Sequence, residues 1–302
     1  MREIEEKTFS NKWFDQWIQT DSYLASDGHV NRIPLRLSSS NIIVYGKALL
    51  SEVLKEFEHE NHRPVTVGGD VPVQIWCNNF TDTDCGPTDS INPYLETWYS
   101  FPVTDKSDPI DLPYENQFSY NVNAPEALTW CHRVLCGPAK DGYALGALAA
   151  IAGGREIWGF PKHPDLADLN FDYPDNKNVV FEASHQGNKV LSLSARLPEA
   201  IDGHVVVKID EITPEGSCIT PRQNPLKANF VAKQTRYKQA FSATMHFSPW
   251  DENTDSLVIY DEELYFGGLI KSWEFKPALK MHCSDLRIVA FKPAGWDPNF
   301  KG

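Results

Sequence analysis

Short apolar runs, most of them bounded by turn residues, dominate the hydrophobic pattern of the chain. The run at 42–45 is typical, because its β-branched residues end at Gly46. Such runs between Gly, Pro, Asn or Asp residues are typical of strands. Many short strands without regularly intervening helices indicate an antiparallel barrel or sandwich. We expect strands at 42–45, 65–67, 71–76, 179–183, 190–195, 204–209, 257–260 and 286–291.

Three segments have the spacing of helices. Residues 11–18 place aromatic side chains at helical intervals, and residues 49–57 place apolar ones on a single face. Residues 143–157 are small and apolar nearly all round, which predicts a buried helix. The sequence therefore predicts a mainly β, α+β fold in which one buried helix could support a site.

Two polar stretches interrupt this pattern. Residues 78–93 and 247–255 are rich in Asp, Asn and Thr, with Pro in each, as surface loops are. We interpret both as loop insertions in a core, with a role as lids or oligomer contacts left open.

Charge and composition exclude several classes of protein. The chain has 302 residues, with 28 Lys and Arg against 41 Asp and Glu, a net charge of −13. That balance argues against nucleic acid as a partner. No apolar run reaches the ~18 residues of a membrane span. The start of the sequence lacks the apolar region of a secretory signal, so we expect a cytoplasmic protein whose six cysteines are reduced and hold no metal.

The segment 153–163 carries the clearest chemical signal. Gly159 ends the predicted helix, and Pro161 biases the preceding residue to an extended conformation. Lys162 then follows among aromatic residues, where burial would lower its pKa. A neutral lysine amine is nucleophilic and can form a Schiff base with a ketone or aldehyde. The alternative is an ordinary lysine whose ammonium group reaches solvent.

This segment resembles the signature of the acetoacetate decarboxylase superfamily, in which a small-residue helix leads to Gly-Arg-Glu, an aromatic stretch and an aromatic-Pro-Lys turn. A weaker likeness extends over about residues 35–295. The resemblance implies one domain over 1–302, with 1–34 as an N-terminal extension, and an antiparallel β-barrel with a few helices. The residues that match the signature are Gly154, Arg155, Glu156, Phe160, Pro161 and Lys162.

The resemblance also implies roles for individual residues. Lys162 matches the Schiff-base lysine, and Glu96, in a Tyr-x-Glu segment, matches the active-site carboxylate. It further implies a cofactor-free enzyme that forms homo-oligomers and takes a small oxo acid. The expected substrate-binding residues are Arg36, Gln74, Trp76, Arg155, Glu156, Phe160 and His163.

The chain departs from the family pattern at three places. His163 stands where a second lysine is usual, and Ser38 falls near the register of an arginine, with Arg36 two residues away. On the strand at 71–76 a carboxylate is expected, but the candidates are Gln74 and Trp76. These changes, with an aromatic pocket that could include Trp98, Trp130 and Trp158, suit a larger, ketide-like substrate.

Three functions remain open from the sequence. The first is a lyase that forms a Schiff base between Lys162 and a β-keto acid and releases carbon dioxide. The second keeps the imine but uses it for aldol addition, dehydration or cyclisation on a larger substrate. The third is a non-catalytic barrel that binds a hydrophobic metabolite.

Overall fold

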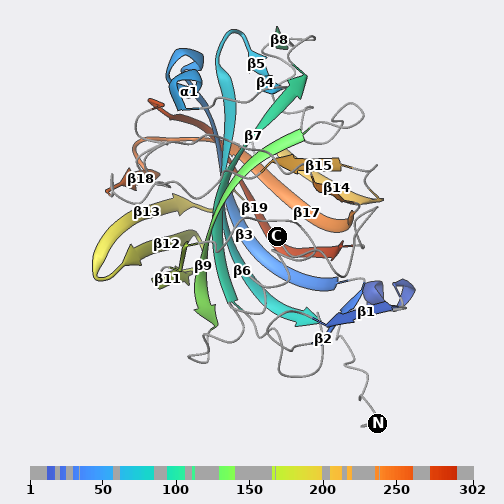
Figure 1. Ribbon diagram of the computed structural model, residues 1–302. Helices are drawn as coiled ribbons and strands as arrows, with labels where there is room; N and C mark the ends of the chain where they lie inside the picture. The colour runs from blue at the N-terminus through green and yellow to red at the C-terminus, as the bar shows by residue number, and fades with distance from the viewer. Residues whose placement is uncertain are drawn as a thin grey trace.

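Strands make up most of the described part of the chain (Figure 1). The helices in that part are α1 (Leu50–Glu56) and the short 3-10 helix η1 (Lys12–Gln16). Neither is long and apolar enough to cross a membrane. The computed structural model describes residues 12–17, 21–24, 30–33, 35–56, 62–84, 94–105, 111–112, 129–139, 165–166, 168–198, 205–212, 216–219, 235–237, 239–260 and 273–290.

A large, strongly bent sheet forms the centre of the molecule. Its neighbours follow the order β14-β17-β19-β3-β6-β7-β9-β15-β16. Pairing is antiparallel from β14 to β9 and parallel between β9 and β15. These strands are β14 (Val205–Ile212), β17 (Gln239–Pro249), β19 (Lys276–Ala290), β3 (Leu35–Ala48), β6 (Val71–Asp84), β7 (Tyr94–Asp105), β9 (Thr129–Ala139), β15 (Gly216–Ile219) and β16 (Thr235–Tyr237).

Shorter strands extend the sheet or form small sheets beside it. The strand β4 pairs with β7, and β10 pairs with β9. Two separate two-stranded sheets join β1 to β2 and β5 to β8. The bounds are β1 (Asp21–Leu24), β2 (Val30–Ile33), β4 (His62–Pro64), β5 (Thr66–Val67), β8 (Asp111–Leu112) and β10 (Asp165–Leu166).

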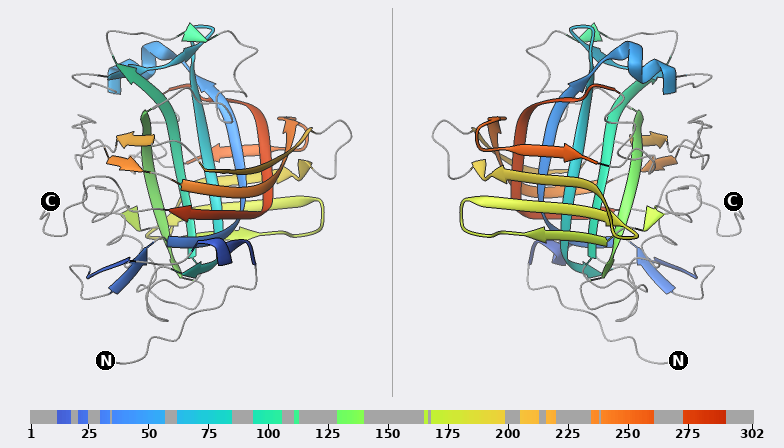
Figure 2. Two further views of the ribbon diagram at one scale, coloured as in Figure 1. Left: turned by 90° about the vertical axis from the view of Figure 1, so that its right-hand side faces the viewer. Right: turned by 90° about the vertical axis from the view of Figure 1, so that its left-hand side faces the viewer.

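A second layer is a four-stranded antiparallel sheet in the order β11-β12-β13-β18. Its strands run crosswise to β3, β6 and β7 of the central sheet (Figure 2). The hairpin between β12 and β13 turns at Gln186 and Gly187, with φ of 51° and 83°. Two positive φ values in a two-residue loop match the twist of paired strands. The bounds are β11 (Asp168–Asp172), β12 (Asn178–His185), β13 (Asn188–Arg196) and β18 (Ser256–Ile259).

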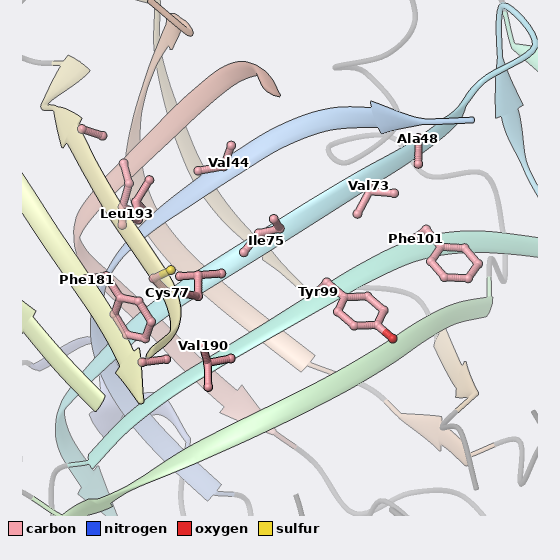
Figure 3. Packing of buried hydrophobic residues seen from close by; sticks show 14 of the residues in the cluster. Val44, Ala48, Val73, Ile75, Cys77, Tyr99, Phe101, Phe181, Val190 and Leu193 are labelled. Carbon is pink, nitrogen blue, oxygen red and sulfur yellow. The ribbon is translucent and has the colours of Figure 1, made fainter. Parts of the chain in front are cut away.

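The main apolar core fills the space between these two sheets (Figure 3). Alternate residues of β6, including Val73, Ile75 and Cys77, point into it and are buried. Residues of β12 and β13 such as Phe181 and Leu193 meet them from the other layer. Removal of this apolar surface from water is the main stabilising contribution of the interface.

A buried ion pair joins the turn after β17 to β19. Lys280 Nζ lies 2.5 Å from both carboxylate oxygens of Asp255, and neither side chain is exposed. The same carboxylate accepts hydrogen bonds from the backbone N–H groups of Arg196 and Asp251. Asp255 therefore holds the end of β13, the turn and β19 together.

All eight expected strands are present, although several are longer than their apolar runs. Residues 42–45 lie within β3, and residues 286–290 are only the end of β19. The expected helix at 49–57 is confirmed as α1, whereas 11–18 contains only the 3-10 helix. The expected helix at 143–157 lies outside the described residues. The mainly β, antiparallel prediction is confirmed, and the described strands form open sheets.

The predicted loop boundaries at 78 and 247 are wrong. Residues 78–84 continue β6, and residues 247–249 complete β17. Polar composition suggested loops, but backbone pairing to β3, β7 and β19 keeps these residues extended. Residues 85–93 lie outside the described part, so an insertion there stays a prediction.

We predict that Lys280→Met destabilises the fold by about 3–5 kcal/mol, because it leaves the Asp255 carboxylate buried without its cation. Urea unfolding measures the loss. The control is Lys47→Met, which removes a partly exposed pair with Asp70 and should cost at most about 1 kcal/mol. Equal losses in the two variants would contradict the structural role of the buried pair.

Candidate functional site

The central strands β3, β6 and β7 have a second face, opposite the main core. Side chains of a strand alternate between its two faces, so the even-numbered residues of β6 point away from Ile75 and Cys77. An apolar cluster on this side includes Ile43, Tyr45 and Met281. We call it the site face; its members used below are Asn41, Tyr45, Gln74, Trp76, Asn78, Glu96, Trp98 and Ser100.

Pairing arranges these residues in rows across the three strands. Gln74 lies opposite Tyr45 on one side and Ser100 on the other. Trp76 lies between Ile43 and Trp98, and Asn78 lies between Asn41 and Glu96. Directly opposed residues on one face have Cβ atoms about 4.5–5.5 Å apart, close enough for their side chains to interact.

A hydrogen bond and a ring stack fix the aromatic part of the site face. Trp76 Nε1 donates to Gln74 Oε1 at 2.8 Å. The indole rings of Trp76 and Trp98 stack with centroids 5.2 Å apart and an interplanar angle of 20°. Gln74 is buried, and both tryptophans are half-buried. Together they form a flat aromatic surface with an amide at its edge.

The Glu96 carboxylate is held from its own strand. Tyr94 donates its hydroxyl hydrogen to Glu96 Oε2 at 3.1 Å. The Tyr94 ring stacks on Phe80 at 4.7 Å between centroids, which fixes the position of the donor. Glu96 is half-buried, so its carboxylate is restrained without being sealed from its surroundings.

Tyr45 contributes a neutral hydroxyl to the same face. Its O–H lies 3.7 Å from Met281 Sδ, and its ring is tilted against Phe247 at 6.4 Å. Burial raises the pKa of Tyr45, and Cys283 nearby raises it further. The group therefore stays protonated through the neutral range and donates its hydrogen to Met281 Sδ.

The structure brings Gln74, Trp76 and Glu96, all expected from the sequence, onto the site face. It places Arg36 elsewhere. Leu37 packs in the apolar cluster of the site face, so alternation turns the buried Arg36 to the opposite side of β3. The remaining candidates, Arg155, Glu156, Phe160, Lys162 and His163, lie outside the described residues.

Three polar residues of the site face were not expected from the sequence. Asn41 and Ser100 sit within strands, and Asn78 was assigned to a loop. All three are at most 1% exposed. Extending the alternation of Gln74 and Trp76 by two residues would have placed Asn78 on the same face.

The central sheet with its crossed second layer is the acetoacetate decarboxylase-like fold. The chain superposes on acetoacetate decarboxylase from Legionella pneumophila subsp. pneumophila strain Philadelphia 1 with a TM-score of 0.50 and 12% identity, over 96% of this chain and 98% of that one. It also matches the enduracididine biosynthesis enzyme MppR with HEPES buffer bound, with a TM-score of 0.51 and 8% identity, over 88% and 89% of the two chains.

A further match is MppR in complex with the condensation product of pyruvate and imidazole 4-carboxaldehyde, at a TM-score of 0.49 and 8% identity, over 88% and 90% of the two chains. No protein-family model matches the sequence, and no curated protein sequence matches it. The matches to acetoacetate decarboxylase and to MppR with HEPES buffer bound confirm the expected family resemblance at the level of the fold.

We predict that Tyr45→Phe makes unfolding less dependent on alkaline pH. Above about pH 10 an unfolded chain loses this proton while the folded protein keeps it, so wild-type stability falls as pH rises. Removing the group should make the slope shallower by up to about 1.4 kcal/mol per pH unit. Urea unfolding as a function of pH measures this. Tyr260→Phe, at an exposed position, is the control; equal slopes for Tyr45→Phe and wild type would refute the assignment.

Proposed function

We propose that this chain is a cofactor-free lyase that forms a Schiff base through Lys162 and decarboxylates a β-keto acid or related oxo acid. The observation that carries the proposal is the acetoacetate decarboxylase-like fold joined to the Gly-Arg-Glu…Phe-Pro-Lys segment. The proposal keeps the expectation of a single domain over 1–302 that forms a homo-oligomer in the cytoplasm.

The site face supports a lyase of this kind. It combines a restrained carboxylate at Glu96, a neutral hydroxyl at Tyr45 and a flat aromatic surface at Trp76 and Trp98. Partly apolar surroundings of this type favour loss of carbon dioxide from a protonated imine that carries a carboxylate, because two opposite charges are converted into a neutral enamine and carbon dioxide. Proton transfer by a positioned carboxylate is a common contribution to such reactions.

The reaction conserves atoms and electrons without an added cofactor. The neutral Lys162 amine adds to the ketone carbon, and with one proton taken up, water leaves as the protonated imine forms. The bond to the carboxylate carbon then breaks, its electron pair moves toward the iminium nitrogen, and carbon dioxide departs. The resulting enamine takes a proton at carbon, and water hydrolyses the protonated imine to release the ketone, return a proton and restore the neutral Lys162 amine.

Glu96 is the residue that we assign to proton transfer or to steering the substrate. A carboxylate that accepts a hydrogen bond from Tyr94 is held in one orientation, which is what transfer to a single carbon requires. The alternative reaction is aldol addition, dehydration or cyclisation of the imine. The paired tryptophans favour it for a larger substrate, because their stacked rings offer a broad apolar contact.

We predict that acetoacetate and sodium borohydride leave a reduced adduct on Lys162, because borohydride traps an imine. Peptide mass spectrometry locates the adduct. Lys55 and Lys189, both exposed, serve as internal controls and should stay unmodified. Lys162→Arg should abolish the adduct in folded protein. An adduct elsewhere, or none at any pH, would refute imine chemistry at Lys162 and favour a non-catalytic binding protein.

We predict that Glu96→Gln slows carbon dioxide release by about 10²–10⁴-fold, the usual contribution of a general acid or base. The imine at Lys162 should still be trapped, because the amide keeps the size of the side chain. Glu182→Gln on β12, whose carboxylate pairs loosely with Lys189, is the matched control and should keep wild-type activity. Unchanged release in Glu96→Gln would remove Glu96 from the mechanism.

A further inference from the structure

Two amides on the site face are buried with atoms that lack hydrogen-bond partners among the described residues. Asn41 is fully buried, and neither Nδ2 nor Oδ1 has a partner. Asn78 is 1% exposed, and its Nδ2 has none. Pairing places them directly opposite each other, with Glu96 next in line. We call Asn41, Asn78 and Glu96 the amide row.

Unsatisfied amides at this position call for an explanation. Burial of a polar group without a partner costs free energy, so most buried polar groups in proteins are hydrogen-bonded. Here three unpartnered atoms occur in two residues that face each other. They lie one row from Trp76 and beside the carboxylate that we assign to the reaction. A bound molecule at the site face would supply the missing partners.

The three unpartnered amide atoms determine which hydrogen-bonding groups that molecule must have. Both Nδ2 atoms donate, whereas Asn41 Oδ1 accepts. A carboxylate only accepts, and the neighbouring Glu96 disfavours a second anion. A ketone oxygen likewise cannot donate to Asn41 Oδ1. A hydroxyl group both donates and accepts, so a single hydroxyl can serve Asn41 Oδ1 and Asn78 Nδ2 together.

We propose that Asn41 and Asn78 form a subsite for a hydroxyl group of the ligand, so that the chain acts on a hydroxylated oxo acid. The hydroxyl donates to Asn41 Oδ1 and accepts from Asn78 Nδ2. The oxo acid in this statement rests on the proposed function, whereas the hydroxyl subsite rests on the amide row. No bond is made or broken at the subsite, which positions the substrate.

The test uses two carboxylates that differ by a single hydroxyl and have no ketone, butyrate and γ-hydroxybutyrate. Neither can form an imine, so their binding is independent of Lys162. Calorimetry on the full chain should show the hydroxy compound binding about tenfold tighter, as one well-made hydrogen-bonded group allows. In Asn78→Leu the two affinities should become equal within about threefold.

Asn79→Leu is the matched control. Asn79 is adjacent on β6, 7% exposed, and also has an unpartnered Oδ1, but it points to the opposite face. It should keep the wild-type preference. Asn41→Leu gives a second variant of the row if Asn78→Leu does not fold.

The outcomes separate the subsite from the reaction. No preference in the wild-type protein would overturn the proposal and mean that the amides hold water only. A preference that survives in both row variants would also overturn it. A preference lost in the row variants and kept in Asn79→Leu supports it, even if borohydride trapping at Lys162 fails and refutes the lyase.

Discussion

Burial of β6 on both faces is the constraint on which the rest of the structure depends. One face must match the apolar surface of the four-stranded sheet, and Val73, Ile75 and Cys77 provide that match. The other face is then assigned by alternation alone, with no freedom to shift register. A slip of one residue would turn Gln74 and Asn78 into the main core and turn Val73, Ile75 and Cys77 onto the site face. The packing of the second layer therefore determines which residues of β6 lie on the site face.

The core side of the central strands also contains a few polar side chains. Thr97, on the core side, donates its hydroxyl to the carbonyl of Trp76 at 2.7 Å, which ties β7 to the strand that carries the stacked tryptophan. Burial raises the pKa of Cys77 to about 12, so this thiol stays neutral and acts as a small apolar group. Thr97 and Cys77 thus add little polarity to the core side, although Asn79 Oδ1 there lacks a partner among the described residues, as do the amides of Asn41 and Asn78 on the site face.

The sequence alone predicted the strands whose apolar residues are contiguous, and it predicted the acetoacetate decarboxylase-like fold from a short motif. It missed strands, or parts of strands, whose residues are polar or mixed and which are held in the sheet by backbone hydrogen bonds. Residues 78–84 look like a loop, yet β3 and β7 on either side satisfy their backbone. The strand β9 has mixed composition and was not expected, because its pairing with β7 is a long-range property. Gln74, Trp76 and Glu96 were found as site candidates, but their grouping on one face depends on register.

Low sequence identity to proteins of the same fold follows from the same physics. The core face requires only apolar residues of suitable size, which many sequences satisfy, so 8–12% identity is compatible with one architecture. The site face has an apolar cluster of its own, but it also carries the buried polar residues Asn41, Gln74 and Asn78. Gln74 and Trp76, the candidates for the position where the family resemblance predicts a carboxylate, hydrogen-bond to each other beside Trp98 within an intact sheet. The substrate specificity of this chain should therefore be tested first at the even-numbered residues of β6 and their neighbours on β3 and β7, where buried polar groups adjoin the apolar cluster.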